Sequence, residues 1–580
     1  MSYHALRVLL LATCLLAARA EAASPAEAAQ SFFRDAFEEH LRDNPEAATA
    51  IGRHDFDDRW ADWSPAGRAR VQQHLQARLR QAAALPTDGL GDEDRLSIRL
   101  FRYVTETDLA ADDLETHLLR VQPLYGLHTR VFLTVDRMPV HSVRDYENVI
   151  ARLRAVPRYV AEQITILDEA AARGLTQPVV VVDVVASQIE HQMSADAQHS
   201  ALTAAFWRFP ASVPVAEQQR LRAAAVAAYD GDFLPAWKRL HDYVAGSYRA
   251  RARTLAGIGS LPDGRAAYQT LIRKLTTTNR TPEEIHALGV KEVERIEAAM
   301  TAVMRETGFD GTLAEFARHL DESPDQHFTS KDEMLVYCRN IAKIIEPELP
   351  NQFKRIPVLL FGVRAIPEDR EQGMASNAQP PTADGSTPGW FNLNTYRPEK
   401  QFRMDKQALT LHEAIPGHVF QGAVARSMTG LPEFRKYYGN SAYNEGWALY
   451  AESLGAELGV YRDPYSRYGQ LSSERFRAVR LVVDTGIHAF GWTRDQALDY
   501  FKQHAPEETA AEIDRYISWP AQALAYKLGQ LEIRGLRTEA EATLGARFDV
   551  REFHDAVLRD GVLPLELLHE QVERYIHGAR

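Results

Sequence analysis

Two histidines and a glutamate within seven residues form the strongest chemical signal in the chain. His412 and Glu413 are adjacent, and His418 follows six positions after His412, among mostly apolar neighbours. Imidazole nitrogens and carboxylate oxygens are the ligands of catalytic zinc, which keeps one position open for water. The segment therefore predicts a zinc site in which His412 and His418 are ligands and Glu413 is the general base.

The spacing of the two histidines departs from the His-Glu-x-x-His pattern, which places both rings on one helix face. Six residues of a straight helix turn through about 600°, so His418 would point about 120° away from His412. Pro416 and Gly417 lie between them, and both favour non-helical geometry. We expect a bulge at this pair that returns His418 to the side of His412. The alternative is that the helix ends at Pro416 and that His418 caps another element.

A second segment supplies a candidate third ligand. Glu445 follows His418 by 27 residues, enough for one helix to end and another to return. Glu452 lies two turns later on the same helix face, among apolar residues such as Trp447. Acidic side chains in such surroundings are expected to lie beside positive charge. We predict that Glu445 binds the metal and that Glu452 holds a ligand imidazole from behind. The alternative is a solvated acidic face.

Three more polar residues recur at every fourth position, namely Arg480, Asp484 and His488. They share one face of a predicted helix, and we expect His488 to face the site and to be oriented by Asp484. A structural salt-bridge network is the alternative. Tyr526 lies in a helix that begins near Pro520, and its hydroxyl could donate to the oxyanion of a tetrahedral intermediate. The alternative for Tyr526 is an ordinary core aromatic.

Helices are the elements expected to position these groups. Helical periodicity covers most of the chain after residue 25, as at 146–173 and 217–255. Thr281, Pro282 and Glu284 form a good helix start, and that helix should run to about Glu306. The predicted fold is therefore mainly α, a large helical protein with a small β-sheet beside the active-site helix.

The small sheet is expected at about 355–395. Residues 355–363 form the best strand candidate, and residues 391–394 alternate as an edge strand would. We expect an extended substrate to pair with this edge, in contact with Trp390, Asn392 and Asn394.

The length of 580 residues exceeds what one hydrophobic core supports, so we expect more than one domain. Residues 1–20 are predicted to be a signal peptide, with an apolar run too short to span a bilayer and a small-x-small site before residue 21. The motif around Cys14 faintly suggests a lipoprotein signal, but Thr13 fits that pattern poorly. We place an N-terminal helical domain at 21–270 and a catalytic domain, helical with the small sheet, at 271–580.

The composition limits the cellular location and the classes of partner that we expect. The formal net charge of −12 makes a nucleic-acid partner unfavourable, and no later stretch is apolar enough to cross a membrane. Once the signal is removed, Cys338 is the single cysteine, expected in the core rather than as a nucleophile. A periplasmic or secreted bacterial protein fits these features. The sequence does not indicate an oligomeric state.

Four motifs in order resemble the bacterial DUF885 family: His-Glu-x-x-Pro-Gly-His, Asn-Glu-Gly-Trp-Ala-x-Tyr-x-Glu, Asp-Thr-Gly-x-His and Pro-x-Gln-Ala-x-x-Tyr-Lys-x-Gly. The resemblance covers about residues 27–575. The family is grouped with zincin-type metallopeptidases, and the arrangement is similar to gluzincins such as the thimet-oligopeptidase group. The resemblance implies that His412, His418 and Glu445 bind zinc, that Glu413 is the base and that Tyr526 stabilises the transition state.

The expected activity is zinc-dependent hydrolysis of peptide bonds in short peptides, with one Zn²⁺ per chain. Three alternatives stay open: hydrolysis of a non-peptide amide or ester, a non-catalytic module that binds metal or peptide, and a helical scaffold whose polar residues form a structural network. The intact Glu413 argues against a pure binding module, because binding alone does not need a base.

Overall fold

The computed structural model describes residues 24–578, apart from 359, 369–370, 372–373, 383–386 and 507–509. The predicted signal peptide, with Cys14, lies outside the described residues. The chain is mainly helical, as predicted. Its first half contains α2 (Pro25–Asp43), α3 (Pro45–Ala50), α4 (Pro65–Ala84), α5 (Asp92–His117), α6 (Leu127–Asp136), α7 (Val143–Ala172), α8 (Val179–His191), α9 (Val215–Ala228), α10 (Leu234–Asp242) and α11 (Gly264–Thr276).

The second half contains the elements that carry the predicted site. Its helices are α12 (Pro282–Glu306), α13 (Leu313–Asp321), α14 (Lys331–Ile345), α15 (Leu349–Gln352), α16 (Arg403–Glu413), α17 (His418–Ser427), α18 (Glu433–Tyr437), α19 (Ser441–Ser453), α20 (Pro464–His488), α21 (Arg494–His504), α22 (Ala510–Ser518), α23 (Ala525–Leu544), α24 (Val550–Leu558) and α25 (Leu565–Gly578).

Several predicted helices have the expected bounds and caps. The helix predicted from Thr281 begins with a capping box between Thr281 and Glu284 and ends at Glu306. The long stretch at 146–173 is α7, which contains Pro157. The segment 217–255 is a nearly continuous run in which two π-helical turns follow α9 and α10. Apolar periodicity was therefore a reliable guide to these helices.

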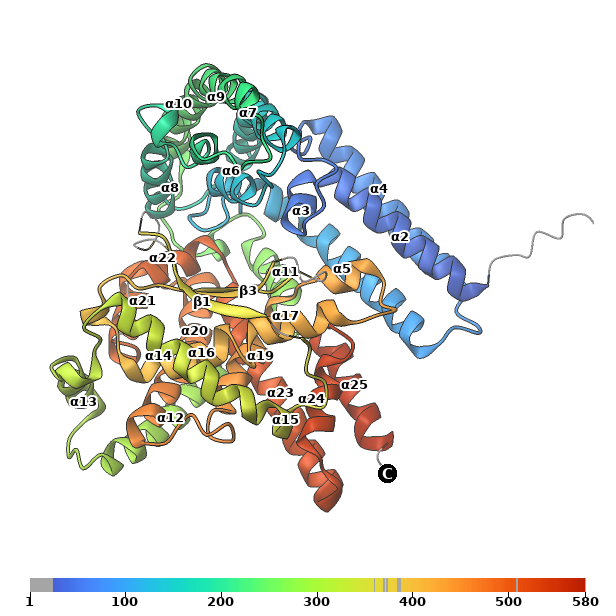
Figure 1. Cartoon of the computed structure of the whole chain (residues 1–580). Helices are drawn as coiled ribbons and strands as arrows, with labels where there is room; N and C mark the ends of the chain where they lie inside the picture. Colours follow the sequence, from blue (N-terminus) through green and yellow to red (C-terminus); the bar gives the residue numbers. More distant parts are fainter. Residues whose placement is uncertain are drawn as a thin grey trace, which may run out of the picture.

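Helices α6 to α10 gather at one end of the molecule, and α2 and α4 run side by side next to them (Figure 1). The later helices form a larger body around α20 and α19. The largest hydrophobic cluster joins the two parts, because Val181 and Trp237 belong to the same cluster as Val483 and Tyr516. The predicted boundary near 270 therefore does not separate two independent cores. How the chain divides into domains stays a prediction.

A three-stranded sheet lies beside the helices of the site. Its strands are β1 (Phe361–Ala365), β2 (Asn377–Gln379) and β3 (Gly389–Leu393), in the order β1-β3-β2. β3 pairs in parallel with β1 and antiparallel with β2. Val363, Phe391 and Leu393 point into a small core that also holds Ala414, the residue directly after α16. The sheet therefore supports the point at which the first histidine helix ends.

The structure corrects two predictions about this sheet. The strand predicted at 355–363 is shifted, since β1 begins only at Phe361. The segment predicted as an edge strand is the central strand β3, with hydrogen-bonded neighbours on both sides. Alternating polar residues suggested an edge, but Asn392 instead bonds to Asn377 and Arg364 on the two neighbouring strands.

Cys338 lies fully buried among the residues that support the sheet. Burial raises the pKa of its thiol to about 11, so the thiol stays protonated and behaves as a core side chain. Within the part of the chain that the structure describes, no helix combines the length and apolar character that crossing a bilayer requires.

Candidate metal centre

α16 carries the first histidine on its last turn. The helix buries Met404, Ala408 and Leu411, which recur at helical spacing. It ends at Glu413, because Ala414 leaves helical geometry with φ −98° and ψ −95°. His412 and Glu413 thus lie at the carboxyl end of a buried helix, where unpaired carbonyls favour positive charge.

A tight turn, rather than a bulge inside one helix, separates the two histidines. α17 begins at His418, directly after Pro416 and Gly417, and the Ile415–Pro416 peptide is cis. A Cβ atom on Gly417 would come within 1.8 Å of the His412 carbonyl oxygen, so only glycine fits. The indole of Trp447 in α19 donates to the Pro416 carbonyl at 2.9 Å. The predicted return of His418 therefore occurs, but through a helix break that α19 holds in place.

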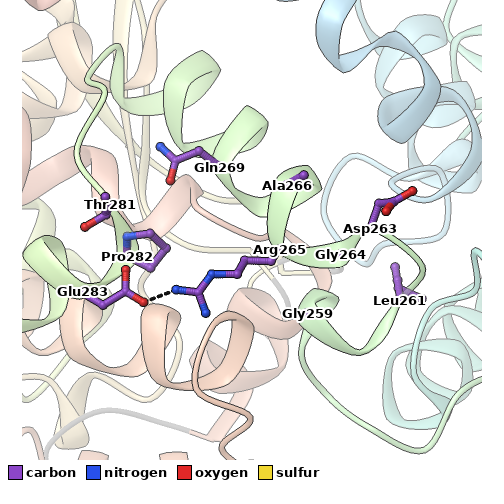
Figure 2. Close-up of a pocket in the computed structure, with 10 residues that line it drawn as sticks. All are labelled: Gly259, Leu261, Asp263, Gly264, Arg265, Ala266, Gln269, Thr281, Pro282 and Glu283. Atoms are coloured by element: carbon purple, nitrogen blue, oxygen red, sulfur yellow. Dashed lines mark hydrogen bonds and ion pairs between the residues drawn. The ribbon is translucent and has the colours of Figure 1, made fainter.

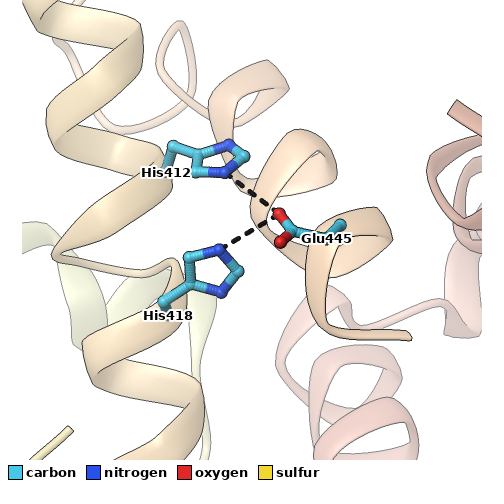
Figure 3. A group of neighbouring side chains, drawn as sticks. All are labelled: His412, His418 and Glu445. Carbon is cyan, nitrogen blue, oxygen red and sulfur yellow. Dashed lines mark ion pairs between the residues drawn. The ribbon is translucent and has the colours of Figure 1, made fainter. Parts of the chain in front are cut away.

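The turn brings the predicted ligands together (Figure 3). The Nε2 atoms of His412 and His418 lie 3.4 and 3.3 Å from the same oxygen, Oε2 of Glu445. The two rings are perpendicular, with centroids 4.9 Å apart. All three ligand atoms lie within 4.8 Å of one another. In the described part of the chain, these residues form the one such group of His, Cys, Asp or Glu side chains.

This arrangement fits a tetrahedral zinc ion. Two atoms that each lie about 2.0–2.1 Å from such an ion are about 3.3 Å apart, close to the two His–Glu separations. Among the described residues, Glu445 Oε2 is a buried oxygen without a hydrogen-bond partner. His412 is buried, whereas His418 and Glu445 keep side-chain exposures of 18% and 20%. One side of the cluster is therefore open, as a catalytic site requires.

Glu452 holds the first histidine from behind. Its Oε1 lies 2.7 Å from His412 Nδ1, and the carboxylate is fully buried. This contact leaves Nε2 of His412 to face Glu445, and it excludes the alternative of a solvated acidic face. Burial alone would lower the pKa of His412, but its contacts with Glu445 and Glu452 raise that pKa to about 10. The surroundings of His412 thus favour a positive charge at this position.

Glu413 shares this environment. Burial raises the pKa of its carboxyl, and the positive charges of His412 and His418 oppose that shift. A carboxyl group with a raised pKa is a better proton acceptor at neutral pH than an ordinary glutamate. For Glu445, by contrast, the charge of His418 and its contact with His412 outweigh burial and hold the pKa well below the usual range. The pKa values of the neighbouring Glu413 and Glu445 are therefore shifted in opposite directions, a pattern found in acid–base catalysis.

Close packing of α19 against α23 positions Tyr526. Gly446 and Gly529 meet at the crossing of the two helices, where a Cβ on Gly446 would lie 2.5 Å from the Gly529 backbone. Glu445 and Tyr526 are thereby fixed beside each other. The Tyr526 ring is nearly parallel to that of His412, with centroids 6.4 Å apart.

The family model that matches the chain is that of a bacterial protein of unknown function, DUF885, over residues 45–572. The chain belongs to the DUF885 family. The crystal structure of "the putative lipoprotein from Colwellia psychrerythraea" is similar, with a TM-score of 0.91 and 26% identity over 96% of this chain and 100% of that one. A "putative lipoprotein of unknown function from Shewanella oneidensis" shares the fold, with a TM-score of 0.72 and 19% identity over 95% and 99% of the two chains. No functionally curated protein matches the sequence significantly.

The structure contradicts the predicted role of His488 in this DUF885 protein. Its Nδ1 accepts from the backbone N–H of Ile258 at 3.1 Å, and its Nε2 lies 3.0 Å from the Tyr516 carbonyl oxygen. Burial lowers the pKa of the ring to about 3, so it stays neutral. With both nitrogens bonded to the backbone and the residue 1% exposed, His488 is a structural residue. The helical stripe was predicted correctly, but not the direction of this side chain.

The rest of the stripe divides between two roles. Asp484 accepts from the Tyr268 hydroxyl and from the Ala521 N–H, and it does not orient His488. Arg480 donates to Tyr516 and pairs with Glu512, and its guanidinium carbon lies 4.6 Å above the ring centre of Tyr526. Arg480 therefore lies beside the site, whereas Asp484 supports the backbone turn before α23.

The strand pairing predicted between a substrate and residues 390–394 is wrong, whereas substrate contact with Trp390, Asn392 and Asn394 stays a prediction. The backbone of β3 is already paired on both sides, and the Asn394 amide donates to the carbonyls of Glu371 and Met374. Trp390 packs under the Arg364 guanidinium at 4.5 Å. These side chains hold the sheet and its loop together, and β3 itself has no free edge with which a substrate could pair.

A shallow hollow elsewhere on the surface shares no residue with the metal centre (Figure 2). It lies where α11 and α12 begin, and an exposed ion pair between Arg265 and Glu283 crosses it. It is lined by Gly259, Leu261, Asp263, Gly264, Arg265, Ala266, Gln269, Thr281, Pro282 and Glu283.

Sequence reasoning missed residues that the fold brings to the site. Arg515 donates to the Tyr526 hydroxyl at 3.2 Å. Tyr125, from the N-terminal half, packs edge-to-face on Trp519 with centroids 5.5 Å apart and remains 52% exposed. Burial and the nearby charges of Tyr526 and Glu445 raise the pKa of Tyr125, which places it near the site. Arg515 lies within eleven residues of Tyr526, so a pattern search could have included it. No spacing could have indicated Tyr125.

Proposed function

We propose that this DUF885 protein is a zinc-dependent hydrolase that cleaves peptide bonds in short peptides. The observation that carries the proposal is the convergence of His412 Nε2, His418 Nε2 and Glu445 Oε2, in which the two His–Glu separations match those around one tetrahedral metal ion. Two histidines and a glutamate with an open side are the ligand set of known zinc peptidases. The expected content is one Zn²⁺ per chain.

The chain's own residues then have separate tasks. A zinc ion held by these ligands would act as a Lewis acid toward water and the scissile carbonyl. Glu413 would take the proton of the attacking water at its carboxylate and deliver it to the leaving amine. Tyr526 would donate a hydrogen bond to the developing oxyanion. By accepting a hydrogen bond from Nδ1–H, Glu452 would keep His412 in the tautomer whose unprotonated Nε2 faces the metal position.

Metal analysis and product identification test this proposal together. The purified chain should contain about one zinc, and mass spectrometry of a mixed peptide pool should show new fragments that disappear with a chelator. Cleavage of amides or esters without peptide cleavage would reassign the substrate. Zinc-loaded protein that binds peptides without cleaving them would make it a binding module.

The Glu413→Gln variant tests the base. Glutamine keeps the shape of the side chain but cannot accept the proton, so kcat should fall roughly 100- to 10,000-fold while zinc content stays unchanged. Steady-state kinetics and metal analysis on the same preparation measure both quantities. A zinc-loaded variant with the full rate would exclude Glu413 as the base.

We also propose that the protein acts outside the cytoplasm, in the periplasm or after secretion. The apolar N-terminal run and the lipoprotein descriptions of both structural relatives support this location. The intact mass of the mature chain distinguishes simple removal of a signal peptide from processing as a lipoprotein. Cleavage after residue 20 leaves an unmodified chain, whereas lipidation would leave acyl groups on Cys14 as the first residue.

A further inference from the structure

We propose that Arg515 is a positioning residue that directs the hydroxyl proton of Tyr526 toward the substrate. The inference rests on the proposed hydrolytic function of the same site. It adds a residue that reaches the reaction only through Tyr526, and it assigns a direction to a hydrogen bond on which oxyanion stabilisation depends.

The donor and acceptor in this contact are unambiguous. Nη2 of Arg515 lies 3.2 Å from the Tyr526 hydroxyl oxygen. A guanidinium offers five N–H donors and no acceptor, so the phenolic oxygen must accept. The hydroxyl proton of Tyr526 is then left for another partner. Among the described residues, no acceptor for that proton lies within hydrogen-bond distance, so the proton is available to a substrate oxygen.

Arg515 is itself held in place from two sides. The same Nη2 donates to Gln522 Oε1 at 2.6 Å, and Nη1 lies 3.4 Å from Glu512 Oε2. Glu512 also binds Arg480 at 3.0 Å, and Arg480 covers the Tyr526 ring. The phenol therefore has one cation at its oxygen and another above its ring, balanced by one carboxylate.

These charges act in the direction that catalysis needs. A hydrogen bond from a cation to a phenolic oxygen draws electron density from the O–H bond and strengthens it as a donor. Because the donor is held before the substrate arrives, little reorganisation is required as negative charge develops. The contribution should therefore appear in the transition state and not in substrate binding.

A double-mutant cycle between Arg515→Gln and Tyr526→Phe tests the inference. Tyr526→Phe should lower kcat roughly 100-fold. Arg515→Gln should lower kcat about tenfold with KM within about twofold, and Arg515→Lys should recover part of the loss. In the Tyr526→Phe background, Arg515→Gln should have no further effect on kcat. Calorimetry should show weaker binding of a phosphinic analogue of the cleaved peptide to Arg515→Gln, by a factor similar to that in kcat.

Arg494→Gln is the matched control. Arg494 forms a two-point ion pair with Asp514, the neighbour of Arg515 on α22, without contacting Tyr526. Its loss should leave kcat, KM and analogue binding unchanged. Thermal unfolding and zinc content should be alike in all variants, which separates positioning from misfolding.

Three results would overturn the inference. Additive losses in the double variant would show that Arg515 acts independently of the hydroxyl. A rise in KM confined to peptides with a free C-terminal carboxylate, absent for amidated ones, would make Arg515 a substrate-binding residue. Both results presuppose an active enzyme and leave the proposed function intact. Zinc-loaded wild-type protein without hydrolase activity would overturn the proposed function and this inference with it.

Discussion

Two buried histidines, each predicted from the sequence to lie beside an acidic residue, have different surroundings in this fold. His412 bonds to Glu452 through Nδ1 and faces His418 and Glu445 with Nε2. His488 bonds to the backbone at both nitrogens, away from the candidate metal centre. The two residues are almost equally buried, at 3% and 1% exposure.

The difference lies in the partner of each ring nitrogen. A carboxylate at Nδ1 favours positive charge and leaves Nε2 for a ligand, whereas two backbone partners use the hydrogen-bonding capacity of a neutral ring. Burial lowers the pKa of both rings, but the contacts of His412 with Glu445 and Glu452 outweigh burial and raise its pKa to about 10, whereas burial prevails for His488 and lowers its pKa to about 3. Burial beside an acidic residue therefore does not identify a functional histidine, but the partners of both nitrogens do.

The strongest test of this difference replaces one histidine of the candidate metal centre and, separately, the structural His488. His418→Ala should reduce zinc from about one per chain to nearly none and abolish hydrolysis, because it removes one of three ligands. His488→Gln should lower the melting temperature but keep zinc and most of kcat. Metal analysis and kinetics on folded protein measure the contrast. Zinc loss in the His488 variant alone would reverse the assignment.

Glu452 and Asp484 provide a second, smaller contrast. Glu452→Gln keeps an oxygen near His412 Nδ1 but removes the charge, so zinc affinity should fall roughly 10- to 100-fold. Asp484→Asn should leave zinc affinity unchanged, since Asp484 contacts Tyr268 and a backbone N–H instead. Competition with a chromophoric chelator measures both. Equal affinities for wild type and Glu452→Gln would show that the carboxylate has no part in metal binding.

The last prediction concerns the pH dependence of stability. Burial raises the pKa of Asp484 to about 7, so the folded chain holds a proton that the unfolded chain releases near pH 4. Wild-type stability should therefore decrease from about pH 4 to pH 7 through this group, at about 1.4 kcal/mol per pKa unit.

Asp484→Asn removes this dependence. The melting temperature of the variant relative to wild type should rise between pH 4 and 7 and level off above pH 7. Any difference in contact energy between the amide and the protonated carboxyl group is the same at every pH, so it does not affect this dependence. Differential scanning calorimetry across the range provides the measurement, and a flat difference would mean that Asp484 is ionised throughout.

Local patterns predicted the helices well, and they identified the three side chains His412, His418 and Glu445 that the fold brings together. The capping box at Thr281 and the apolar spacing of α16 depend on neighbours along the chain, and the paired acids on α19 depend on helical periodicity. The direction of His488 could not be predicted, because it depends on Ile258 and Tyr516, which are remote in the sequence. The central position of β3 depends on β2, a strand of three residues that has little signal of its own. Each wrong prediction arose where contacts with residues remote in the sequence, rather than local propensity, determined the structure.

The crossing at Gly446 and Gly529 has a consequence for how substrate enters. Since Glu445 and Tyr526 flank the close approach of two helices, the distance between the proposed metal ligand and the proposed oxyanion donor cannot vary without separating those helices. In the proposed hydrolase, any opening and closing would then involve parts of the chain other than this helix pair. Catalytic geometry and substrate access would thus be controlled by different parts of the chain, and either could change in evolution while the other is conserved.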